Sequence, residues 1–161
     1  MQIIKKHDFG STDFFWELRR FDNFDPIFHV AKANPSEPVP VWLFFSAAVT
    51  HRNVIAQAID FSMHLALRGP LADKNGFTLD PFCALPTFIP GAVYANNILN
   101  ATQHYGHASI VGYTTVTETG WYRAEVWGKS RSDAATTGQN GLAELTQEPN
   151  VLNQLLVRVE D

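Results

Sequence analysis

The sequence predicts an α+β domain in which a mainly antiparallel sheet packs against one well-defined amphipathic helix and one or two shorter helices. Three segments carry this prediction. Residues 51–68 repeat with helical spacing, residues 39–48 have the composition of a buried strand, and residues 109–131 have the pattern of a β-hairpin. A length of 161 residues suits a single domain, 1–161, because domains most often hold about 100–150 residues.

The first predicted element is a short helix over 11–20. A capping residue stands at its start, and Phe14, Phe15 and Leu18 fall on one side. Residues 34–40 hold three prolines and predict a loop. Residues 39–48 are rich in β-branched and aromatic residues and almost free of polar groups, which predicts a strand buried on both faces. Their length of about ten residues also suits a buried helix.

The best-marked helix is expected over about 51–68. Thr50 suits an N-cap, Gly69 stands where a left-handed residue ends many helices, and Pro70 follows. The apolar positions at helical spacing are Val54, Ile55, Ala58, Ile59, Met63, Ala66 and Leu67. The polar stripe beside them consists of Asn53, Gln57, Asp60, His64 and Arg68. We therefore expect this helix to lay Ile55, Ile59 and Met63 on the core.

The rest of the chain predicts loops, short elements and strands. Residues 71–90 suit an extended loop or edge strands because of their prolines. Residues 91–105 favour a helix over a strand, although their asparagines are poor helix formers. A helical turn is expected over 142–148 and a closing strand over 155–159.

The hairpin of residues 109–131 is expected to turn near Glu118-Thr119-Gly120. Its second arm alternates, so its side chains divide between two faces. Tyr122, Ala124 and Val126 form one face. Trp121, Arg123, Glu125, Trp127 and Lys129 form the other. Aromatic residues mixed with charges are not typical of a core, whereas tryptophan and arginine are enriched where proteins bind other proteins. We therefore predict that the second face is an interface, the alternative being that the chain's own side chains cover it.

Two pairs of residues are the candidates for chemistry. On a helix Asp60 and His64 would share a face, where the carboxylate could orient the imidazole as a general base, although a solvated polar stripe explains them as well. His104 and His107 are the candidates for a metal, but zinc normally takes three or four ligands at recognisable spacings. We therefore predict no metal and no cofactor. Cys83 lies among apolar residues and is expected to be inert.

Composition and short sequence patterns limit the kinds of partner and the location that we expect for this protein. A formal net charge of −4 argues against a nucleic-acid partner. The apolar run at residues 41–49 is too short to cross a membrane, the first residues lack the apolar stretch of a secretion signal, and a single cysteine favours a reducing compartment. We expect a cytoplasmic protein or one assembled in a particle.

The function expected from these features is a structural or interaction subunit of a larger, homo-oligomeric assembly, such as a viral structural component. The fraction of charged residues, 17%, is low, which favours burial of surface against copies of the chain. The alternative is a small enzyme or ligand-binding domain with Asp60, His64, His104 and His107 around a pocket. No motif favours the enzyme.

Overall fold

A computed structural model describes residues 1–8, 12–13, 17–21, 24–32, 34–75, 85–132, 143–146 and 153–161. Of these, only the backbone is described at 7–8, 12–13, 50–60, 96–105, 131–132 and 143–146. Every regular element in the described part of the chain is a β-strand, and all the pairings are antiparallel. The predicted α+β class is therefore wrong.

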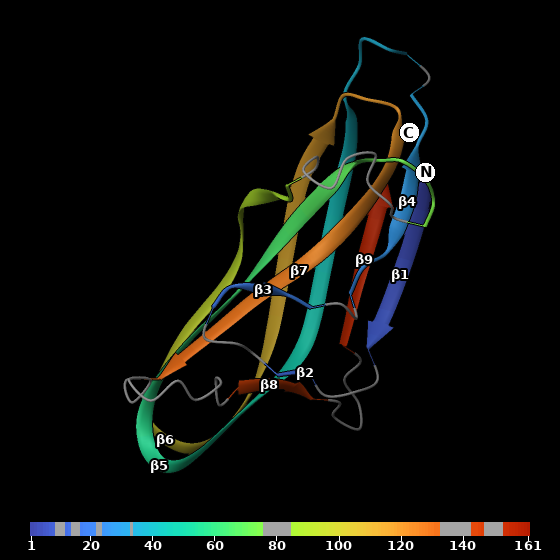
Figure 1. Cartoon of the computed structure of the whole chain (residues 1–161). Helices are drawn as coiled ribbons and strands as arrows, with labels where there is room; N and C mark the ends of the chain where they lie inside the picture. The colour runs from blue at the N-terminus through green and yellow to red at the C-terminus, as the bar shows by residue number, and fades with distance from the viewer. Residues whose placement is uncertain are drawn as a thin grey trace.

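The strands form two layers (Figure 1). The first layer contains β1 (Gln2–Asp8), β9 (Asn153–Val159), the first half of β5 (Val39–Leu71) and the second half of β6 (Thr87–Val116).

The second layer contains the first half of β6, the second half of β5 and β7 (Gly120–Ser132). Beyond β7 lie β3 (Arg19–Arg20) and β4 (Ile27–Val30). The short strands β2 (Thr12–Asp13) and β8 (Ala143–Thr146) pair with each other, and β8 also pairs with β5.

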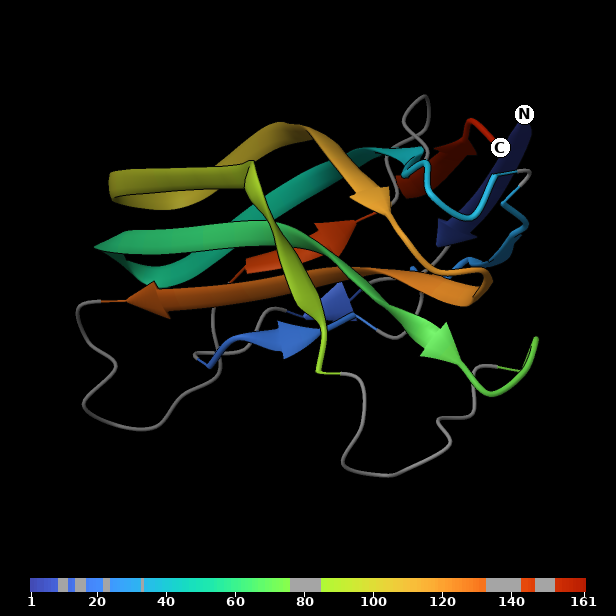
Figure 2. The ribbon, with the colours of Figure 1, turned by 90° about the horizontal axis from the view of Figure 1, so that it is seen from above.

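The two long strands belong to both layers. β5 pairs with β9 through residues 41–46 and with β7 through residues 59–71. Between these stretches β5 and β6 curve back together, as Figures 1 and 2 show. The curve coincides with shifts of the β5–β6 register between Arg52 and Gln57 and between Gln57 and Ile59, where extra residues bend a strand.

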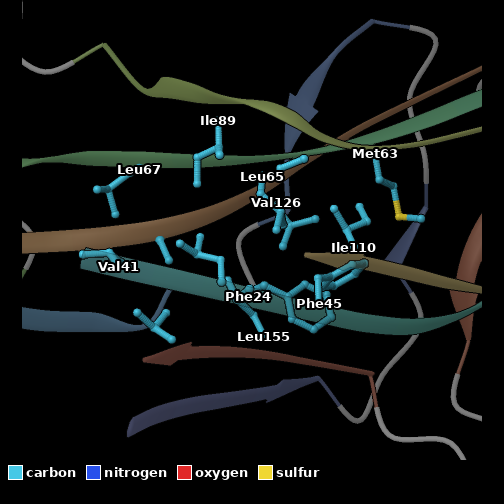
Figure 3. Close-up of a cluster of buried hydrophobic side chains, with 14 of the residues drawn as sticks. Phe24, Val41, Phe45, Met63, Leu65, Leu67, Ile89, Ile110, Val126 and Leu155 are labelled. Atoms are coloured by element: carbon cyan, nitrogen blue, oxygen red, sulfur yellow. The ribbon is translucent and has the colours of Figure 1, made fainter. Parts of the chain in front are cut away.

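The core lies between the layers and takes side chains from both (Figure 3). The labelled members of this cluster are Phe24, Val41, Phe45, Met63, Leu65, Leu67, Ile89, Ile110, Val126 and Leu155. Phe24 and Phe45 meet edge to face with ring centroids 5.2 Å apart. Burying a large apolar side chain contributes about 1.5–3 kcal/mol, so this cluster is the main source of stability.

The predicted helix over 51–68 is part of β5 instead. Phe61, Met63, Leu65 and Leu67 are all buried on the face that meets the core. Residues four apart share a face on a strand as well as on a helix, so Met63 and Leu67 fit both patterns. Leu65 fits only the strand, because on a helix it would lie on a different face from Met63 and Leu67. Met63 is buried as expected, whereas the side chains of Ile55 and Ile59 lie outside the described residues.

The sequence predicts that Gly69 follows the end of a helix, but its role in the structure is different. It lies in β5 with a φ of 150°, and a Cβ there would lie 2.5 Å from Cδ1 of Tyr122 and 2.8 Å from the carbonyl oxygen of Trp121. A glycine at this position therefore lets β5 and β7 approach closely.

The other predicted helices are also wrong wherever the structure describes them. Residues 91–105 belong to β6, because their pairing with β5 outweighs their local propensity. In the segments 11–20 and 142–148, the regular elements among the described residues are the strands β2, β3 and β8, and none is a helix. Cys83 and residues 14–16 lie outside the described part of the chain.

Three strand predictions are confirmed in part or in full. β5 begins at Val39, but Phe44 is 37% exposed, so the strand is not buried on both faces. The closing strand is β9. The second arm of the predicted hairpin is β7. The two arms do not pair with each other as a hairpin would, because each pairs with β5: the first arm, in β6, pairs with it in the first layer, and β7 pairs with it in the second. The turn at 117–119 therefore connects the two layers.

Candidate functional site

The outer face of β7 carries the side chains that the sequence predicted there. Tyr122, Ala124 and Val126 are buried against the core, as expected. Their neighbours along the strand therefore point outward, away from the other layer. These are Trp121, Arg123, Glu125, Trp127 and Lys129.

Glu125 is the centre of this face and its side chain is fully buried. Its Oε1 accepts hydrogen bonds from Nε of Arg68 at 2.7 Å and from Nε of Arg123 at 2.9 Å. Its Oε2 accepts one from Nε1 of Trp127 at 2.9 Å. Arg20 Nη1 lies 3.9 Å from Oε1. A buried carboxylate needs such partners, because an unpaired buried charge is very costly.

The register explains why Glu125 is needed here. Arg68 of β5 and Arg123 of β7 lie directly opposite each other, an arrangement in which like charges repel. Glu125 is two residues further along β7, on the same face and opposite the small side chain of Ala66. It therefore reaches both guanidinium groups and offsets their repulsion.

The pKa of the Glu125 carboxyl lies below its ordinary value. Burial alone would raise this pKa, but the hydrogen bonds from Arg68, Trp127 and Arg123 favour the charged form and outweigh burial. Glu125 is therefore ionised at neutral pH and holds β5 and β7 together across the outer face.

Both tryptophans of this face contact other rings of the same chain. The ring centroids of Trp121 and His29 lie 4.9 Å apart, and those of Trp127 and Phe88 lie 5.7 Å apart. Each indole is half-buried by these neighbours. The face can therefore bury apolar surface without a partner, and its role as an interface stays a prediction.

Asp60 and His64 are not brought together as a helix would bring them. On a strand, residues four apart are separated by about 13 Å along the chain direction. The His64 ring is 3.1 Å from Oγ of Ser62 and contacts the Phe88 ring at 6.1 Å. Burial lowers the His64 pKa, and the positive charge of Lys129 lowers it further. The side chain of Asp60 lies outside the described residues.

His104 and His107 both belong to β6, and His107 is exposed. His107 Nε2 lies 2.9 Å from Oγ of Ser46 on β5, whereas the side chain of His104 is not among those described. Within the described residues, no group of three His, Cys, Asp or Glu side chains is placed to hold a metal.

A cavity of about 190 Å³ opens between the layers near the turn at 117–119. Its polar lining includes Thr87, Thr114, Thr117 and Glu118. Of the residues proposed for catalysis or metal binding, His64 and His107 have described side chains, and neither lines the cavity. The cavity therefore does not contain the two histidines, His64 and His107, that the structure describes.

Sequence reasoning missed an exposed apolar surface on the outer face of the first layer, which we call the aromatic patch. It consists of Trp42 and Phe44 of β5 with Val111 and Tyr113 of β6. Val111 is 54% exposed and Tyr113 is 49% exposed. The Trp42 ring lies 4.6 Å from that of Tyr113 and 6.4 Å from that of Phe44, so the patch is continuous.

The patch ends at an unusual edge. Among the described strands, β6 pairs only with β5, so one side of β6 is open along both layers. Its 30 residues include no Lys, Arg, Asp or Glu. This lack of charge can be seen in the sequence alone and was the available signal for the missed surface, because edge strands are usually protected by charged side chains.

Comparisons with known proteins do not assign the chain to a family. No protein-family model matches the chain, and no curated protein is significantly similar to it in sequence. The described part of the chain contains no helix long and apolar enough to span a membrane.

Proposed function

We propose that this chain is a structural or interaction subunit that assembles with copies of itself. A viral particle, as expected from sequence, is one such assembly. The observation that carries the proposal is the aromatic patch on β5 and β6, together with the lack of charge on β6. Continuous exposed apolar surface on a folded domain marks a site of protein association.

Burial of the patch would provide the driving force. Apolar surface removed from water contributes roughly 25 cal/mol per Å². Phe44, Val111 and Tyr113 are each more than one third exposed, so they have surface left to bury. Aromatic residues at the centre of an interface contribute most to binding.

The absence of charge favours a second copy over a different partner. Two identical surfaces bring like charges together wherever a charged residue meets its own copy. β6 has no charged residue and therefore meets no such penalty. A partner recognised through charge would find no complementary group on this strand.

The test is the molar mass in solution across a dilution series, measured by light scattering after size exclusion. The wild-type mass should exceed that of the monomer and fall on dilution. Tyr113→Lys should give a folded monomer at concentrations where the wild type is assembled, because it removes an aromatic ring from the patch and assembly would bury an unpaired charge. A wild type that stays monomeric at every concentration overturns the proposal.

Ile3→Lys is the matched control. Ile3 is 56% exposed, close to Tyr113 in exposure. It lies on the same outer face but on β1, and Arg158 of β9 stands between Ile3 and Trp42. The control adds the same charge outside the aromatic patch and should assemble like the wild type. Equal loss of assembly in both variants would contradict the assignment to the patch.

A further inference from the structure

We infer that two copies associate edge to edge, with β6 of one pairing antiparallel with β6 of the other across a two-fold axis. This inference rests on the proposed function and specifies its geometry. It continues the first layer of one subunit into that of the next. Backbone groups of the open strand then supply hydrogen bonds, and the aromatic patches of the two copies meet beside the junction.

The two open edges of the first layer differ. β1, at one end, carries Lys5 and Lys6, and lysine on an edge discourages pairing. Gln2 of β1 donates a hydrogen bond from Nε2 to the carbonyl oxygen of His29 in β4, which links the two layers on that side. β6, at the other end, has neither feature among the described residues.

The two halves of β6 differ as well. The half in the second layer contains Pro90 and Gly91, which has a φ of 75°, and its register with β5 shifts between His64 and Ala66. Proline and irregular register both protect an edge. The half in the first layer, residues 106–116, has no proline and keeps one unbroken register from Val39–Val116 to Val49–Gly106. The first-layer half of β6 is therefore a regular edge strand with no feature that would prevent another strand from pairing with it.

Symmetry then fixes which residues meet. If residues 106–116 overlap fully, Val111 lies at the two-fold axis opposite its own copy, and Ser109 lies opposite Tyr113. His107 lies opposite Thr115. Every such pair is free of like charges, and pairing over this length forms on the order of ten hydrogen bonds between subunits. The outward side chains of Val111 and Tyr113 extend the patch across the junction.

Amide hydrogen exchange at residues 106–116, followed residue by residue by NMR, tests the pairing. An edge strand bonds its neighbour through alternate residues only, so in a monomer every second amide is open to water. In the edge-paired assembly all these amides should exchange slowly, and dilution or Tyr113→Lys should release every second one.

The possible outcomes distinguish a failure of edge pairing from a failure of assembly. An assembly in which alternate amides of residues 106–116 still exchange as fast as in the monomer contradicts edge pairing, but leaves the proposed function standing. Its subunits would then associate through the face of the patch. Absence of any assembly overturns both.

A cysteine at the axis tests the two-fold register. In a Cys83→Ser background, Val111→Cys should form a disulfide-linked dimer under mild oxidation. Opposite residues of an antiparallel pair have Cα atoms about 4.5–5.5 Å apart, within the range of a disulfide. Ile3→Cys in the same background is the matched control and should remain monomeric on a denaturing gel. Equal yields from the two variants would rule out the register centred on Val111.

Discussion

Glu125 shows how much depends on one buried carboxylate. Two arginines from different strands donate to its Oε1, and a tryptophan donates to its Oε2. Removing one member of a buried ion pair is far more damaging than removing an exposed one, because the remaining charge stays in a medium of low polarity. The residue is therefore expected to matter for stability whether or not its face binds a partner.

Glu125→Gln should lower the free energy of unfolding by about 3–5 kcal/mol, the range for breaking a buried ion pair. Urea denaturation measures this. Glu160→Gln is the control, since Glu160 forms an exposed ion pair with Arg158 at 2.8 Å and such pairs contribute about 0–1 kcal/mol. Similar small losses in both variants would show that the Glu125 cluster does not hold β5 to β7.

The same residue predicts a loss of stability in acid. Because the pKa of Glu125 is lower in the folded chain than its ordinary value of 4.5, its contribution is present above about pH 4.5 and is lost as the pH falls through the folded pKa. Urea midpoints of the wild type and Glu125→Gln should therefore converge as the pH is lowered from 4.5. A gap of constant size would contradict the linkage.

His64 predicts a separate dependence nearer neutrality. Burial and then Lys129 lower its pKa from 6.5, so the unfolded chain takes up this proton more readily than the folded one. Stability should therefore fall as the pH drops below 6.5. His64→Gln should flatten this slope, and Lys129→Gln should flatten it in part, as measured by melting temperatures between pH 7 and 5. Unchanged slopes would show that another group is responsible.

At the scale of elements, Leu65 distinguishes the strand from the predicted helix. Its side chain is fully buried between the layers. Leu65→Ala should cost about 2–5 kcal/mol, because it removes apolar contacts and leaves a cavity. Val93→Ala, at an exposed position of β6, is the control and should change stability little. Comparable losses measured in urea would mean that the face of β5 is misassigned.

The helix predicted over residues 51–68 was wrong for a physical reason. A spacing of four residues is common to one face of a helix and one face of a strand, so Ile55, Ile59, Met63 and Leu67 satisfied both. Alternation from Phe61 to Leu67 was present in the sequence, but the capping residues on either side outweighed it. β7 was predicted well because its alternation includes charged residues, which exclude the helical pattern.

At the scale of the molecule, the candidate surfaces depend on register, which local patterns do not reveal. Arg68 and Glu125 are 57 residues apart in the chain, and they meet only because β5 pairs with β7. Phe44 and Val111 come together in the same way through β5 and β6. The sequence therefore predicted the outer residues of β7, but neither the partners of Glu125 nor the aromatic patch.

The curve shared by β5 and β6 determines how cooperatively the protein unfolds. Because each long strand supplies backbone partners to both layers, neither layer can melt without pulling apart strands of the other. We expect one cooperative transition, with the calorimetric enthalpy equal to the van't Hoff enthalpy. In a monomeric background, Leu65→Ala should speed exchange of the slowest amides in β9 as much as in β7, although Leu65 lies in the layer of β7. Selective loss of protection in β7 would mean that the curve acts as a hinge between independently melting halves.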